Sequence, residues 1–220
     1  MPPVQSPSDL PGHRAPCVLL TGFDAFGSDR LAPQPVNPSW LAVQALHGCY
    51  IEGHTVMAAQ LPTVFGAATA ELMRLMDLHQ PALVVCVGQA GGRSAVSLER
   101  VAVNLVDAHI PDNAGAQPKD QPVVAGAPAA YFSTLPVTAM LKALRAAGLS
   151  AELSYSAGPF VCNHVFYGLM HALATQPSLY GVRGGFVHVP YVPSQGVPNL
   201  PLKDAMRGLR LAVICALTCP

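Results

Sequence analysis

The sequence predicts an α/β fold, a three-layer αβα single domain with a largely parallel twisted sheet. Short apolar runs alternate along the chain with segments whose apolar residues recur at helical spacing, which is the pattern of βαβ units. A length of 220 residues suits one such domain. Hydrophobic residues make up 51% of the chain and charged residues 11%, so a large buried core is expected without disulfide support.

Composition also limits the kinds of molecule that the protein is expected to bind. Twelve basic side chains balance 12 acidic ones, so nothing favours nucleic acid or an anionic membrane as a partner, and a small uncharged ligand fits better. The cysteines form no C-x-x-C pair and no zinc-ligand spacing, so we expect neither a disulfide framework nor a metal site. They are Cys17, Cys49, Cys86, Cys162, Cys215 and Cys219.

The two ends of the chain predict its location. Residues 1–15 are rich in Pro and Ser and lack the apolar core of a signal peptide, so we expect a disordered lead-in, with the domain spanning 16–220. The apolar stretch Leu200–Thr218 carries Lys203 and Asp204 among other charges, which favours an amphipathic helix over a membrane span. A cytoplasmic protein is the resulting expectation.

The first half of the chain predicts strands and helices in alternation. Asn37 and Pro38 suit the N-cap and first position of a helix, and a second helical stripe ends before Pro81. Continuous apolar runs ending near glycine or proline indicate buried strands. These are Cys17–Gly22, His54–Leu61 and Leu83–Gly88.

The run Leu98–Leu105 has the composition of a further strand. Because side chains alternate along a strand, Glu99 is expected on the same face as Val101, Val103 and Leu105. A carboxylate among apolar side chains is partly buried and needs a partner.

The second half continues the alternation. Residues 107–126 are rich in Pro, Asp, Asn and Gly and predict an irregular loop, of the kind that often forms a binding loop or lid. A helix is expected over Leu135–Ala147, a strand over Ala151–Ser156, a helix starting just after Cys162, and a strand closed by Pro190.

Three side chains in this pattern could carry chemistry. Cys162 stands where a strand turns into a helix, and the unpaired N–H groups and dipole of a helix start favour a thiolate. A nucleophilic cysteine also needs a base and a group that orients the base, for which His188 at a strand end and Glu99 are candidates. A small buried hydrophobic residue is the alternative interpretation of Cys162.

Five stretches, spread from Thr21 to Gln195, resemble the pyroglutamyl peptidase I family of cysteine peptidases, which remove N-terminal pyroglutamate. They cover most of the chain and occur in the family's order. They are TGFDAFG with NPSW, GQAGGRSAVSLERVAVN, IPDNAGAQP, SAGPFVCNHVFYGLMH and GGFVHVPYVPSQ.

The resemblance implies a catalytic triad of Glu99, Cys162 and His188, with an acyl-enzyme thioester and no metal or organic cofactor. It also implies that Phe23 and Phe26 clamp the pyroglutamyl ring and that Gln89, Phe160 and Val161 line the pocket. Taken alone, the two loop phenylalanines would equally suit a structural role. Peptides with N-terminal pyroglutamate are then the expected partners, and self-association into a homo-oligomer stays open.

The sequence departs from the family at three places. His109 stands where the family has arginine in A-R-I-P-D-N, and because His is mostly neutral above pH 7, any electrostatic role there weakens with rising pH. Pro159 replaces a small polar residue before the nucleophile, and SDRLAPQPV looks like an insertion. A weakly active or inactive relative that binds pyroglutamyl peptides, and a related N-terminal acyl amide hydrolase, are therefore kept as alternatives.

Two other motifs have simpler explanations. His164 and His171 lie seven residues apart beside Tyr167, but no carboxylate or thiol at ligand spacing joins them, so we expect a solvated helix face and no metal. The glycines of GQAGGR do not complete a dinucleotide fingerprint.

Overall fold

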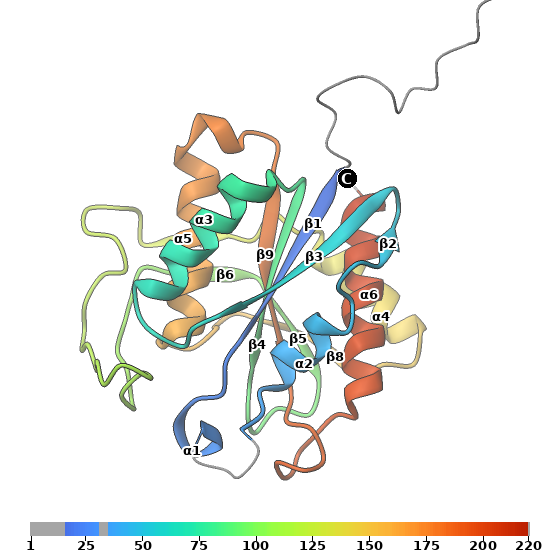
Figure 1. The fold of residues 1–220 in the computed structure, drawn as a ribbon, viewed down its shortest axis with the longest axis horizontal. Helices are drawn as coiled ribbons and strands as arrows, with labels where there is room; N and C mark the ends of the chain where they lie inside the picture. Colours follow the sequence, from blue (N-terminus) through green and yellow to red (C-terminus); the bar gives the residue numbers. More distant parts are fainter. Residues whose placement is uncertain (1–15, 31–34, 220) are drawn as a thin grey trace, which may run out of the picture.

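The computed structural model describes residues 16–30 and 35–219. Within these ranges it has three layers, with one central twisted sheet covered by helices on both faces (Figure 1). The expected fold class is confirmed. The predicted disordered lead-in, residues 1–15, lies outside the described residues, as do positions 31–34 of the predicted insertion.

The central sheet has seven strands in the order β2-β3-β1-β4-β9-β5-β8. Its core strands β1, β4 and β9 are almost wholly buried, as their continuous apolar runs predict. The strands are β1 (Cys17–Phe23), β2 (Tyr50–Ile51), β3 (His54–Leu61), β4 (Leu83–Gln89), β5 (Val96–Glu99), β8 (Ala151–Ser154) and β9 (Arg183–Val189).

The helices divide between the two faces of this sheet (Figure 1). On one face lie α2 (Pro38–Gln44), α4 (Val137–Ala146) and α6 (Leu202–Thr218), and on the other α3 (Ala67–His79) and α5 (Val161–Thr175). Asn37 caps α2 as predicted, because its Oδ1 accepts a hydrogen bond from the backbone N–H of Ser39 over 3.0 Å. Short helices α1 (Gly27–Arg30) and η2 (Pro177–Leu179) were not foreseen.

The sheet is mixed at two places. Strands β3, β1, β4 and β9 are mutually parallel, but β5 pairs antiparallel with β9 and β2 pairs antiparallel with β3. The reversal at β5 places Glu99 beside Phe186 in register and Ser97 beside His188. A residue from an antiparallel strand therefore reaches the same region as the ends of the parallel strands.

The prediction of one strand over Leu98–Leu105 is wrong. Strand β5 ends at Glu99, and after Arg100 the chain enters β6 (Val101–Val103), which pairs with β7 (Ala130–Phe132) in a separate two-stranded sheet. The break lies at Arg100, whose backbone N–H donates to the Ser154 carbonyl and whose carbonyl accepts from the Ser133 N–H. The shared face therefore stops at Glu99, which is fully buried, whereas Leu105 is 38% exposed.

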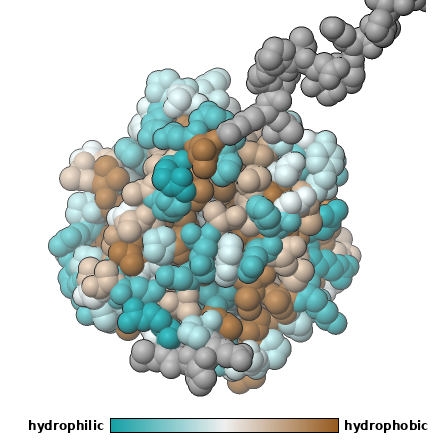
Figure 2. Space-filling view, in the orientation of Figure 1, coloured by the Kyte–Doolittle hydropathy of each residue, from teal (hydrophilic) through white to brown (hydrophobic). Residues whose placement is uncertain are grey.

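The last helix, α6, is amphipathic, as predicted. Among the described helices, none is long and apolar enough to cross a membrane. Helix α6 turns Leu209, Ala212 and Val213 inward, as an amphipathic surface helix does. On the face of the molecule drawn in Figure 2, polar and apolar residues are interspersed.

Candidate active site

Helix α5 places the Cys162 thiol over strand β4. The helix begins at Val161, so Cys162 lies in its first turn and not just ahead of it. An ideal Cβ built on Gly88 would stand 2.9 Å from the Cys162 sulfur and 2.9 Å from the Phe186 ring. Only glycine lets the sulfur come this close to the sheet, which explains the residue type at position 88.

The side chain of Asn163 holds the start of α5 in place by hydrogen bonds. This side chain is fully buried, and its Nδ2 donates to the carbonyls of Val103 and Leu105 at 2.8 and 3.0 Å while its Oδ1 accepts from the Val103 N–H at 3.0 Å. Three hydrogen bonds to the β6 segment fix where the first turn lies. The asparagine after Cys162 therefore sets the position of the thiol.

His188 and Glu99 form a buried pair beside that thiol. His188 is the register partner of Gly88 across the parallel pair β4–β9. Its Nδ1 donates to Glu99 Oε1 over 2.8 Å, and the two residues are 3% and 0% exposed. The bond fixes the tautomer of a neutral imidazole, because Nδ1 carries the hydrogen and leaves Nε2 as the basic nitrogen.

The electrostatics of the two acidic groups differ. Burial acts to raise the pKa of Glu99, but hydrogen bonding and charge from His188, with smaller contributions from Ser154 and Arg93, hold that pKa below its usual range. Burial, and after it the negative charge of Glu99, raises the pKa of the Cys162 thiol to about 12. Burial therefore opposes the thiolate that the helix start was expected to favour, and a base beside the thiol gains importance.

The residues expected in the substrate pocket lie around this centre in two groups. The rings of Phe26 and Phe160 lie 5.9 Å apart between centroids and are tilted by 37°, and both residues are half-buried. Phe23 and Val161 are buried at 2% and 0% exposure, and the Phe23 ring lies 6.3 Å from that of Phe186. The half-buried pair can meet a ligand directly, whereas the buried pair supports the wall from behind.

Gln89 follows Gly88 at the end of β4 and is held by Gln195. Gln195 Oε1 accepts from the Val192 N–H over 3.1 Å, and its Nε2 donates to Gln89 Oε1 over 3.0 Å. This chain of hydrogen bonds sets the orientation of the Gln89 amide. Gln195 closes the last of the recognised motifs, but a role for its side chain was not foreseen.

Phe65 is a second residue that the sequence did not indicate. Its ring meets Phe160 edge-on at 5.3 Å and His164 at 5.6 Å, so it extends the aromatic wall from the loop before α3. Its backbone N–H donates to Asp112 Oδ2 over 2.9 Å. A lone phenylalanine in a loop carries no sequence signal of this position.

Residues 107–126 form an irregular loop, as predicted, with a single bridge between Val106 and Gln121. Asp112 and Asn113, from the IPDN motif, hold this loop in place by hydrogen bonds. Besides holding Phe65, Asp112 accepts from Ala116, and Asn113 Nδ2 donates to the carbonyl of Ala25 over 2.9 Å. The loop is thus tied to the segment that bears Phe23 and Phe26. His109 is exposed on this loop. The Pro159 carbonyl, just before α5, accepts a hydrogen bond from the backbone N–H of Asp107 on the same loop.

The expectation of a solvated face at His164 and His171 is wrong. His164 Nδ1 and Thr69 Oγ1 share a hydrogen bond of 3.0 Å, and His171 Nδ1 shares one of 3.0 Å with the hydroxyl of Tyr131. Burial lowers the pKa of His164. Helix α3 and the β6–β7 ribbon cover this side of α5. Among residues 16–30 and 35–219, no group of three or more His, Cys, Asp or Glu side chains could hold a metal ion.

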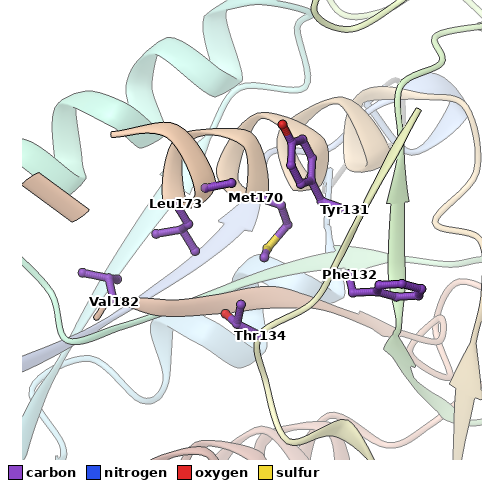
Figure 3. A pocket seen from close by; sticks show the side chains of 7 residues that line it. Tyr131, Phe132, Thr134, Met170, Leu173 and Val182 are labelled. Atoms are coloured by element: carbon purple, nitrogen blue, oxygen red, sulfur yellow. The ribbon is translucent and has the colours of Figure 1, made fainter. Parts of the chain in front are cut away.

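A separate cavity of about 240 Å³ lies between the second half of α5 and the segment that carries Tyr131, Phe132 and Thr134 (Figure 3). Seven residues line it, and none is a thiol, carboxylate or imidazole. They are Tyr131, Phe132, Thr134, Met170, Leu173, Ala174 and Val182.

A thiol at a helix start beside a histidine that is oriented by a buried carboxylate is the set of groups found in cysteine hydrolases. Comparison with known proteins narrows this class. Residues 17–218 match the family described as pyroglutamyl peptidase, and the chain belongs to that family.

The relatives agree along nearly the whole chain. The pyrrolidone-carboxylate peptidase of Cupriavidus taiwanensis is 54% identical over 208 residues, covering 92% of this chain and 94% of its own. Among solved structures, pyroglutamyl peptidase I of Bacillus amyloliquefaciens superposes with a TM-score of 0.86 at 43% identity, covering 91% and 96% of the two chains. Pyrrolidone carboxyl peptidase of Pyrococcus furiosus gives 0.85 at 39%, covering 91% and 97%.

Proposed function

We propose that this protein is a cysteine exopeptidase that hydrolyses the amide bond after an N-terminal pyroglutamyl residue. One observation carries the proposal beyond family membership. The 2.8 Å pair of His188 and Glu99 stands in register beside Gly88, the glycine against which the Cys162 sulfur lies. These three side chains are therefore assigned as nucleophile, general base and orienting carboxylate.

The reaction begins with attack of the Cys162 sulfur on the pyroglutamyl carbonyl. Because burial raises the pKa of the thiol to about 12, little thiolate exists at rest, and the thiol proton passes to His188 Nε2 as the carbon–sulfur bond forms. Glu99 stabilises the imidazolium that results. Backbone N–H groups in the first turn of α5 are placed to stabilise the oxyanion.

The tetrahedral intermediate collapses when His188 gives its proton to the leaving amine. The peptide departs with a new N-terminal amine, and the pyroglutamyl group stays on Cys162 as a thioester. Water then attacks the thioester with His188 as base, which releases pyroglutamate and returns the proton to sulfur. The scheme uses no metal or organic cofactor.

The ring of the substrate suits the aromatic wall. A pyroglutamyl lactam is flat and uncharged, so Phe26 and Phe160 can bury it while Gln89 hydrogen-bonds to its polar edge. Phe23 and Val161 support this wall as buried neighbours. The substrate class is therefore peptides with N-terminal pyroglutamate.

Three further properties of the enzyme are its location in the cell, its partners and its oligomeric state. We propose that the enzyme is cytoplasmic, has no nucleic-acid or membrane partner, and forms a homo-oligomer. Size-exclusion chromatography with light scattering tests the oligomeric state. The neutral charge balance supports the absence of a nucleic-acid or membrane partner.

One assay tests the function. Wild type and Cys162→Ala are given pyroglutamyl-aminomethylcoumarin, and fluorophore release is followed; Cys49→Ala serves as the matched control because it removes another half-buried free thiol. We expect turnover by wild type and by the control, and a loss of at least about 10³-fold for Cys162→Ala. Iodoacetamide should inactivate wild type with a label on Cys162 ahead of the other cysteines.

The outcomes separate the alternatives. Binding of a pyroglutamyl peptide without turnover by wild type would favour the weakly active binder. Turnover confined to other N-terminal acyl amides would favour the related hydrolase. Full turnover by Cys162→Ala would overturn the assignment of the nucleophile.

A further inference from the structure

Arg93 contacts the same carboxylate oxygen that His188 uses. Its Nη1 donates to Glu99 Oε1 over 2.8 Å, and His188 Nδ1 donates to that oxygen over 2.8 Å. The Arg93 side chain is 28% exposed while that of Glu99 is 0% exposed. Glu99 is therefore held between an imidazole on one side and a guanidinium on the other, and only the guanidinium reaches the surface.

The Arg93 guanidinium also donates hydrogen bonds to the segment that leads into α5. Nη1 donates to Ser154 Oγ over 3.3 Å, and Nη2 donates to the carbonyl of Ser156 over 3.0 Å. Four residues separate Ser156 from Val161, where α5 begins. Arg93 thus joins the loop after β4, the end of β5 and the approach to Cys162.

The charges that reach the thiol are few. Glu99 from β5 and Cys86 from β4 act to raise the pKa of Cys162, Arg93 acts to lower it, and His188 stands on the neighbouring strand β9. Without Arg93, a buried negative charge would face the nucleophile with only His188 to offset it. A negative charge near a thiol opposes formation of the thiolate.

We propose that Arg93 is a positioning residue of the active site, which holds Glu99 in place for His188 and offsets its negative charge toward Cys162. This inference rests on the proposed function above. Arg93 acts through Glu99 and does not touch the reacting atoms. Its effect is therefore on how readily Cys162 ionises.

A second arginine in the chain provides the contrast. Arg74 also pairs with a carboxylate, Glu71, at 2.7 Å, but the two side chains are 59% and 33% exposed. Exposed pairs of this kind contribute little because water screens them. Arg74→Gln is therefore a matched control that removes the same charge from a pair of the same type.

The experiment measures the rate of Cys162 alkylation by iodoacetamide against pH, together with kcat and KM, in wild type, Arg93→Gln, Arg93→Lys and Arg74→Gln. For Arg93→Gln we expect the alkylation rate at pH 8 to fall about tenfold, because less of the thiol ionises, and kcat to fall about tenfold with KM changed less than about twofold. Arg93→Lys, which keeps the charge but not the two-armed geometry, should restore most of the alkylation rate and part of kcat. Arg74→Gln should match wild type.

Several results would overturn the proposal. An unchanged alkylation profile in Arg93→Gln means that the guanidinium does not act on the thiol, and equal profiles in the Gln and Lys variants mean that charge is not the cause. If Arg93→Gln fails to fold, Arg93→Lys decides alone, since an alkylation rate at pH 8 far below that of wild type contradicts the charge effect. Failure of the proposed function is separate, because it would show as absent pyroglutamyl turnover in wild type whatever the alkylation profile.

Discussion

The two faces of the central sheet are covered by helices in the same way but are built from different chemistry. Under α2, α4 and α6 the contact is apolar, with fully buried side chains such as Met140 and Leu144. Under α3 and α5 the sheet buries Glu99 and His188 among aromatic residues, and Asn163 fastens the helix above them. Buried polar groups cost free energy unless they are paired, so this face depends on the hydrogen bonds of Asn163 and on the pair of His188 with Glu99 Oε1.

The comparison teaches where function can be placed in such a fold. The apolar face supplies stability that tolerates small changes in packing, whereas the α5 face depends on a few exact partners. Substitutions on the first face should therefore change stability alone, and substitutions on the second should change activity as well. Five predictions test this difference, from the largest expected effect to the smallest.

The largest effect is expected on the α5 face at Glu99. In Glu99→Gln the imidazole loses its orienting charge, and kcat should fall about 10³-fold, as when the carboxylate of a catalytic triad becomes an amide. The measurement is steady-state hydrolysis of pyroglutamyl-aminomethylcoumarin. A decrease of less than about tenfold would contradict the role assigned to Glu99.

Glu99 also links stability to pH. Because the folded-state pKa of Glu99 is lowered, its ionised form stabilises the fold above its usual pKa, and this contribution is lost as the pH falls through the folded value. Urea unfolding at several pH values from 7 to 3 should thus show a smaller acid-induced loss of stability in Glu99→Gln than in wild type. Parallel curves would contradict the lowered pKa.

A matched pair of leucines compares the two faces directly. Leu144 on α4 and Leu169 on α5 are both fully buried, and alanine at either should lower the free energy of unfolding by about 2–4 kcal/mol. Leu144→Ala should keep kcat within about twofold of wild type at 25 °C, because its cavity lies across the sheet from Cys162. Leu169→Ala should lower kcat further, since it loosens the helix that carries the nucleophile. Equal kcat values in the two variants would remove the distinction.

A smaller effect is expected at His164. Burial lowers its folded-state pKa, so below about pH 6.5 the unfolded chain binds a proton that the folded protein does not, and stability falls with falling pH. His164→Gln should lose less stability between pH 7 and pH 5 than wild type in urea unfolding. His109→Gln, at an exposed histidine, is the control and should follow the wild-type curve.

The smallest effect is expected at the loop departure. His109→Arg restores a permanent charge at an exposed position, so activity above neutral pH should rise by at most about fivefold, the range of a screened surface charge. The pH–rate profile of kcat/KM tests this. An unchanged profile would show that the charge at position 109 has no influence on the reaction.

Local sequence signals predicted much of this molecule. The buried strands β1, β4 and β9 follow from continuous apolar runs, and the start of α2 follows from Asn37 and Pro38, because these signals depend on neighbouring residues alone. The two-stranded sheet of β6 and β7 was missed for the opposite reason. Its pairing joins residues about thirty positions apart, and at the break Arg100 forms hydrogen bonds to distant carbonyl and amide groups.

The sequence by itself determined the fold class, the family and the three residue types that suit the chemistry, because apolar periodicity and motif order are written along the chain. Only the tertiary structure decided that Glu99 reaches His188 from an antiparallel strand, that Gly88 makes room for the Cys162 sulfur, and that burial raises the pKa of that thiol to about 12. It also decided the place of Arg93 on the shared oxygen. Distances and desolvation arise from residues that meet only when the chain is folded, so no local pattern can report them.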